Sequence, residues 1–125
     1  MGFYSIRPDR LANGRPLVKL ILRGTMDRDE AHEMITQLRA ALAAVIGDES
    51  CALLIDHREQ ETLTAGARKA LADEVNDPLY WRIAFLGGSV FIRTVSRFIL
   101  RASGQTHKAR FFSDVQEALQ WLQEG

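Results

Sequence analysis

The stretch Val18-Lys19-Leu20-Ile21-Leu22-Arg23-Gly24-Thr25-Met26-Asp27 decides the fold of this 125-residue chain. Its apolar residues at positions 18, 20 and 22 follow the two-residue period of a half-buried strand. Gly24 permits a sharp backbone reversal, and Asp27 is placed to accept hydrogen bonds from the first amides of a helix. The residues that follow have helical spacing and predict one apolar stripe. This stripe consists of Ala31, Met34, Ile35, Leu38, Leu42 and Val45.

The overall charge excludes a strong general attraction to nucleic acid. The 16 basic and 16 acidic residues cancel, so no net field draws the chain to a polyanion. The charge is nevertheless uneven, because residues 78–113 contain five arginines and one lysine but neither Asp nor Glu. This distribution fits either two solvated faces of opposite sign or a surface for a partner.

Several classes of site are disfavoured by the composition. The single cysteine, Cys51, begins an apolar run and is expected to be a small core residue. His32, His57 and His107 lack the spacing of metal ligands, so neither a metal nor another cofactor is expected. Since the sequence has no apolar leader and no run of membrane-spanning length, we expect a cytoplasmic protein.

The order of elements predicts an α/β domain that spans residues 1–125. In the first half of the chain we expect a strand at 3–7, a turn at 8–15, a strand at 17–23, a helix at 27–46, a strand at 51–56 and a polar loop at 57–63. In the second half we expect a helix capped by Thr64 and running to 75, a strand at 82–86, a helix at 90–102, a strand at 108–112 and a helix capped by Ser113. A hairpin followed by alternating strands and helices predicts a mixed sheet of about five strands with four helices.

The opening pattern resembles that of STAS domains, the fold shared by anti-sigma-factor antagonists and the cytoplasmic tails of sulphate transporters. Gly24-Thr25-Met26-Asp27 matches the first landmark of this family, and Leu53-Leu54-Ile55-Asp56 followed by Thr64-Ala65-Gly66 matches the second. In detail the chain is more similar to small bacterial SpoIIAA-like proteins, which are also compared with lipid-binding Sec14 modules. The resemblance implies a STAS-like fold.

The same resemblance implies a candidate phosphorylation site at Thr64. In the anti-sigma antagonists, a partner kinase phosphorylates a Ser or Thr at this helix start. Thr64 is equally suited to an ordinary N-cap, so both interpretations stay open. Acidic residues in the preceding segment, Asp56, Glu59 and Glu61, are expected to strengthen the effect of an added phosphate by repulsion.

Three further groups are candidates for contact with a partner or ligand. Asp56, His57 and Arg58 follow a central strand, where open α/β sheets place ligand sites, although a solvated loop with one ion pair explains them equally. The turn Gly87-Gly88-Ser89 precedes a helix and can either bind an anion or be a tight turn. Arg93, Arg97 and Arg101 form a row along the helix expected at 90–102.

The apolar residues of that helix exceed what one core-facing stripe requires. The surplus indicates contact with an acyl chain, a second copy of the chain or a membrane surface, unless the helix is deeply buried with its arginines reaching outward. Two functions from different classes follow. The first is a non-enzymatic domain that binds a protein partner, such as a kinase-type anti-sigma regulator. The alternative is a carrier of a lipid or another apolar small molecule.

An enzyme that uses Asp56 and His57 as acid and base is a third class. The sequence does not bring a nucleophile, a base and an oxyanion site together, so this reading is disfavoured.

Overall fold

The computed structural model describes residues 4–87, 93–94, 97, 101, 104 and 108–125. Its helices and strands are β1 (Tyr4–Arg10), β2 (Pro16–Met26), α1 (Arg28–Ile46), β3 (Cys51–Leu63), α2 (Ala65–Val75), β4 (Tyr80–Leu86), β5 (Ala109–Phe112) and α4 (Val115–Gln123).

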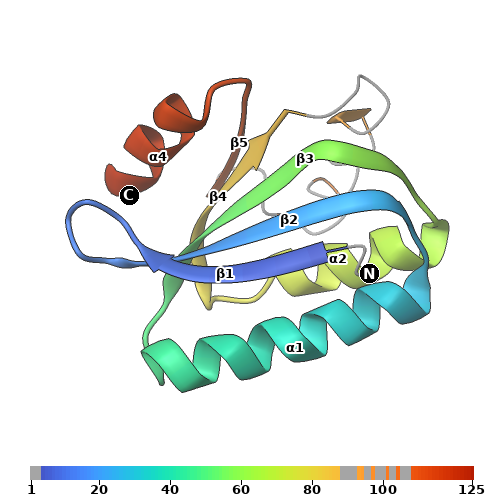
Figure 1. Ribbon diagram of the computed structural model, residues 1–125, viewed down its shortest axis with the longest axis horizontal. Helices are drawn as coiled ribbons and strands as arrows, with labels where there is room; N and C mark the ends of the chain where they lie inside the picture. Colours follow the sequence, from blue (N-terminus) through green and yellow to red (C-terminus); the bar gives the residue numbers. More distant parts are fainter. Residues whose placement is uncertain (1–3, 88–92, 95–96, 98–100, 102–103, 105–107) are drawn as a thin grey trace.

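These strands form one mixed sheet in the order β1-β2-β3-β4-β5. Only β1 runs antiparallel to its neighbour; β2, β3, β4 and β5 are mutually parallel. Helices α1 and α2 cover one face of the sheet, and α4 lies on the other (Figure 1). The expected class and sheet are thereby confirmed. Of the helix expected at 90–102, the described residues Arg93, Thr94, Arg97 and Arg101 have helical backbone.

The core is built where the two-residue period of β2 meets the helical period of α1. Val18, Leu20 and Leu22 lie in the cluster under α1 and α2, which also contains Leu38 and Leu42. The expected stripe is confirmed except at its margins. Ile35 is half-buried, and Val45 is 51% exposed because it lies on the solvent side of the last helical turn.

Gly24 does not reverse the chain, so the expected tight turn at this position is wrong. Strand β2 continues through Gly24 to Met26, and the register with β3 shifts on both sides of the glycine. Gly24 has a φ of +59°, a conformation that favours glycine and is typical of residues in β-bulges. The glycine therefore bends the strand without ending it.

Helix α1 begins and ends at the residues expected from the sequence, whereas the N-cap of α4 lies one residue later than expected. Asp27 caps α1, accepts from the amide of Glu30 at 2.9 Å, and receives the reciprocal contact from the Glu30 side chain. Gly47 ends the helix as predicted. The cap of α4 is Asp114 and not Ser113, since the Asp114 carboxylate accepts from Gln116 N at 3.0 Å.

The segment 57–63 is strand and not the expected polar loop. It extends β3 beyond its pairing with β4, which ends at Asp56, and it pairs with β2 as far as Met26. His57, Gln60 and Leu63 point inward and are buried, whereas Arg58, Glu59 and Glu61 are exposed. Because its inward positions are partly polar, this strand lacks the apolar alternation by which strands are recognised.

Candidate functional site

Three of the candidate residues meet where the pairing of β3 with β4 ends. Asp56 and Arg58 project from the same side of β3, and the Arg58 Nη2 lies 2.8 Å from Asp56 Oδ2. Burial raises the pKa of Asp56, but hydrogen bonds from the Arg58 side chain and backbone outweigh it and hold this pKa below its usual value. The Arg58 side chain lies directly over Gly87, where a Cβ would overlap its Cγ.

Gly87 joins this pair to the next candidate, Arg93. The Arg93 Nε donates to the Gly87 carbonyl oxygen at 3.4 Å, and the Gly87 amide donates to the Phe112 carbonyl oxygen at 2.9 Å. The glycine has a φ of +70°, so its backbone conformation also disfavours a side chain. Gly88 and Ser89, which the sequence grouped with Gly87, lie outside the described residues, as do all the apolar residues at 90–100.

His57 points to the opposite face of the sheet and is part of the core. It is 2% exposed and stacks on Phe85, which in turn stacks on Phe111 with a centroid distance of 4.9 Å. The Arg97 guanidinium lies 5.2 Å from the centre of the Phe111 ring, so four side chains form a continuous row. Burial lowers the pKa of His57 to about 4, although the charge of Asp56 opposes this change. His57 is therefore neutral near pH 7 and shielded from solvent.

Thr64 lies apart from these residues. It caps α2, with its Oγ1 accepting from Ala67 N at 3.2 Å and its amide donating to the Met26 carbonyl oxygen at 3.0 Å. Roughly 25 Å of extended strand separates it from Asp56. Thr64 therefore does not lie at the end of the sheet where Asp56 and Gly87 meet, because the segment between is strand.

The surroundings of Thr64 are the amino-terminal ends of two helices. Gly66 packs so closely on Arg28, the first residue of α1, that a Cβ on the glycine would lie 2.6 Å from the Arg28 Cβ. Arg68 is also close, since its Nη1 donates to the Leu63 carbonyl oxygen at 3.1 Å. The side chain of Thr64 is exposed. Two positive helix ends and two arginines therefore adjoin an accessible hydroxyl.

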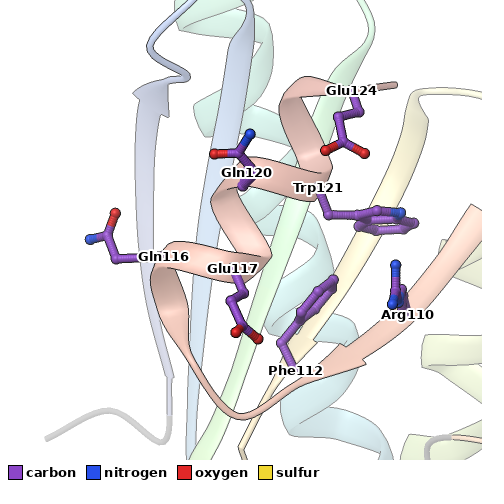
Figure 2. A pocket seen from close by; sticks show the side chains of 7 residues that line it. All are labelled: Arg110, Phe112, Gln116, Glu117, Gln120, Trp121 and Glu124. Carbon is purple, nitrogen blue, oxygen red and sulfur yellow. The ribbon is translucent and has the colours of Figure 1, made fainter.

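A surface hollow beside α4 was not foreseen from the sequence. It has a volume of about 520 Å³ and is bordered by α4 and β5 (Figure 2). Phe112 and Trp121 line it with ring centroids 5.6 Å apart, and the Arg110 guanidinium lies 5.4 Å from the centre of the Phe112 ring. The only sequence signal was the aromatic content of the last strand and helix, which fits a core equally well.

A second group missed by sequence reasoning lies at the other end of α2. Glu74 accepts from Arg39 Nε at 2.7 Å and from the Tyr80 hydroxyl at 2.5 Å, and Arg39 also reaches Asp77 at 2.9 Å. Burial together with the Glu74 contact raises the pKa of Tyr80. Nearby Cys51 is buried, which raises its thiol pKa to about 12, so it behaves as the expected core residue. This network joins α1, α2 and β4 and is structural.

Two other expectations concern metals and membranes. Within the described ranges, no three His, Cys, Asp or Glu side chains are grouped as a metal site would require. Among the helices of that same part of the chain, none is both long and apolar enough to cross a bilayer.

Comparison with known proteins identifies the fold and a sequence family. Residues 21–125 match a family described as a domain of unknown function, DUF7793. A search of curated proteins found no match. An uncharacterized protein of the DUF3478 family from Shewanella loihica PV-4, which has a SpoIIAA-like fold, is similar in structure with a TM-score of 0.72 and 21% identity over 98% of this chain and 95% of that one.

The anti-sigma factor antagonist SpoIIAA, solved in its unphosphorylated form, is similar with a TM-score of 0.62 and 11% identity. The match covers 97% of this chain and 99% of SpoIIAA. Both similarities extend over nearly the whole length of each protein. They show that this chain has the SpoIIAA-like fold, as the STAS resemblance implied.

Proposed function

The chain belongs to the DUF7793 family, and we propose that it is a non-enzymatic, STAS-like binding domain that contacts a protein partner and is switched by phosphorylation of Thr64. The observation that carries this proposal is the exposed hydroxyl of Thr64 at the junction of α1 and α2. A protein of the same fold, the anti-sigma factor antagonist SpoIIAA, has a solved structure that is described as its unphosphorylated form. By analogy, a kinase-type anti-sigma regulator is the class of partner to test first.

The surroundings of Thr64 suit a phosphate. A phosphoryl group adds a charge of about −1.5 to −2 and three acceptor oxygens. At the start of α2 it would lie at a positive helix end, close to Arg68 and to the aliphatic part of Arg28, whose Nη2 lies 3.5 Å from Asp29 Oδ1. The change is then a local reversal of surface charge, which alters the affinity for a partner without unfolding the domain.

Two of the three acidic residues expected to repel this phosphate, Asp56 and Glu59, have other partners. Asp56 is paired with Arg58 far along β3, and Glu59 lies 3.5 Å from Arg23. Repulsion by these two carboxylates is therefore not part of the proposal. In the proposal, the charge of the phosphate itself changes the affinity for the partner.

The non-enzymatic part of the proposal is supported by the two residues that the sequence offered as acid and base. His57 is 2% exposed and lies among aromatic rings, on the face opposite Asp56. The Asp56 carboxylate is held by Arg58. Neither group is available to exchange a proton with a shared substrate.

Crosslinking inside cells tests the switch. A photoreactive benzoylphenylalanine replaces the exposed Ala65, and adducts are identified by mass spectrometry in chains with Thr64 or Thr64→Glu. We expect a discrete adduct that is lost with Thr64→Glu, whereas a benzoylphenylalanine at exposed Arg7 on β1 gives none of it. The same adduct at equal yield in both chains would reject Thr64 as a switch.

The lipid carrier remains the alternative proposal. It rests on the apolar residues at 90–100, all of which lie outside the described part of the chain, so no described contact favours it. Native mass spectrometry of protein purified from cells distinguishes the two. Bound fatty acid or phospholipid would favour the carrier. A location in the cytoplasm likewise stays a prediction.

A further inference from the structure

Four arginines lie on β5 or in the segment between β4 and β5, and we refer to Arg93, Arg97, Arg101 and Arg110 as the arginine rim. They belong to the segment 78–113, which has no acidic residue. The two other basic side chains of this segment, Arg82 and Lys108, donate hydrogen bonds to backbone carbonyl oxygens of the fold. Arg82 Nη1 donates to the Trp121 carbonyl oxygen at 2.5 Å, and Lys108 Nζ donates to the Tyr80 carbonyl oxygen at 2.9 Å.

The contacts of the rim place it at one end of the sheet. Arg97 lies over the ring of Phe111 and Arg110 over that of Phe112, on opposite faces of β5. Arg93 contacts the Gly87 carbonyl oxygen at 3.4 Å. Arg101 has helical backbone and follows Arg97 at the spacing of one turn.

Three of the four rim side chains are available to a partner, whereas Arg93 is half-buried and contacts the Gly87 carbonyl oxygen. Arg97, Arg101 and Arg110 are exposed, and none of the four takes part in an ion pair with another described residue. A guanidinium stacked on an aromatic face keeps its in-plane N–H groups for other acceptors. The ring also restricts the side chain, which reduces the entropy lost when a ligand binds.

The rim has a border of opposite charge on its α4 side. Figure 2 shows Glu117 and Glu124 on α4 around the hollow in which Arg110 lies. Neither glutamate forms an ion pair with Arg110 in the described structure. Arg97 lies over Phe111 on the other face of β5, away from this border, and Arg101 follows it by one helical turn.

We propose that the arginine rim is a docking surface for an acidic, Asp- and Glu-rich segment of a protein partner. Planar guanidinium groups match carboxylates in bidentate pairs. The chain has a net charge of zero, so it lacks the broad positive field with which proteins capture nucleic acid. This surface is distinct from the one around Thr64 and does not depend on phosphorylation.

Fluorescence anisotropy with a fluorescein-labelled deca-glutamate peptide tests the proposal. In 50 mM NaCl we expect saturable binding that weakens at least tenfold in R97Q/R101Q, because two charge-assisted contacts are lost. The matched control R7Q/K69Q removes the same charge from exposed positions on β1 and α2 and should bind like the wild type. Circular dichroism confirms that both variants are folded.

Two further probes separate the other occupants. Wild-type protein that binds deca-thymidylate DNA or phosphatidylserine vesicles more tightly than deca-glutamate would overturn the proposal in favour of nucleic acid or membrane. Equal loss of peptide binding in R97Q/R101Q and R7Q/K69Q would overturn it as well, since the effect would then be one of net charge. A T64E chain that still binds deca-glutamate separates this result from the fate of the Thr64 switch.

Discussion

The imidazole of His57 lies flat against the ring of Phe85, with ring centroids 5.4 Å apart and an interplanar angle of 5°. This contact buries a titratable group between the sheet and its helices and excludes it from surface chemistry. It also gives the protein a specific dependence on pH. The reason is that the pKa of His57 is lowered to about 4 in the folded chain.

We therefore predict that the protein loses stability as the pH falls from about 6.5 to 4. In this window the unfolded chain binds a proton at His57 and the folded chain does not, so acid favours unfolding. The full contribution is present above pH 6.5, and the loss reaches roughly 3 kcal/mol near pH 4. Urea denaturation at a series of pH values measures it. His57→Phe should flatten the profile in this window, while exposed His32→Gln should leave it as in the wild type.

The buried carboxylate of Glu74 supports a second prediction. Glu74→Gln removes the charge that Arg39 and the Tyr80 hydroxyl share, leaving a half-exposed guanidinium with a weaker partner. We expect the free energy of unfolding to fall by about 2 kcal/mol. The exposed neighbour Asp73→Asn on the same helix should change it by less than about 0.5 kcal/mol. Equal urea midpoints for the two variants would contradict a structural role for the network.

These predictions depend on features that the sequence revealed to different degrees. The strand of Val18–Leu22, the Asp27 cap and the burial of Cys51 follow from local periodicity and capping chemistry, and all are confirmed. The extension of β3 to Leu63 was missed because His57 and Gln60 occupy inward positions that local patterns assign to apolar residues. Burial of such residues is decided by tertiary packing, here by Phe85 and by β2.

The candidate site shows the same division. Asp56 and Arg58 lie where the pairing of β3 with the parallel strand β4 ends, and Gly87 follows β4, so their proximity is foreseeable from the topology. The separation of Thr64 from them is not, since it depends on whether 57–63 is loop or strand. The hollow beside α4 depends on where that helix crosses the sheet, and no local pattern encodes this position.

The close contact between Gly66 and Arg28 leads to a third prediction. Gly66→Ala improves helix propensity, yet its new Cβ would lie 2.6 Å from the Arg28 Cβ, an atom at the root of the side chain. The helices must move apart, and we expect a loss of about 1–3 kcal/mol in unfolding free energy. Thermal denaturation measures this loss. In the double variant Gly66→Ala/Arg28→Gly the contact is relieved, so the two substitutions should cost less together than their sum; strict additivity would argue against the contact.

Arg82 provides the last prediction, which concerns the attachment of α4. Its Nη1 donates to the Trp121 carbonyl oxygen at the carboxyl end of the helix, and its guanidinium lies 4.5 Å from the centre of the Trp121 ring. Because the last turn of α4 contains no basic residue of its own, this arginine supplies the cation that the negative helix end favours. Arg82→Met keeps most of the aliphatic contact and removes the charge. Amide hydrogen exchange of α4 should become several-fold faster while that of β2 and β3 is unchanged, since the helix opens locally before the sheet does. Exposed Arg7→Met serves as the control, and equal acceleration across the whole sheet would mean that Arg82 acts on global stability and not on the docking of α4.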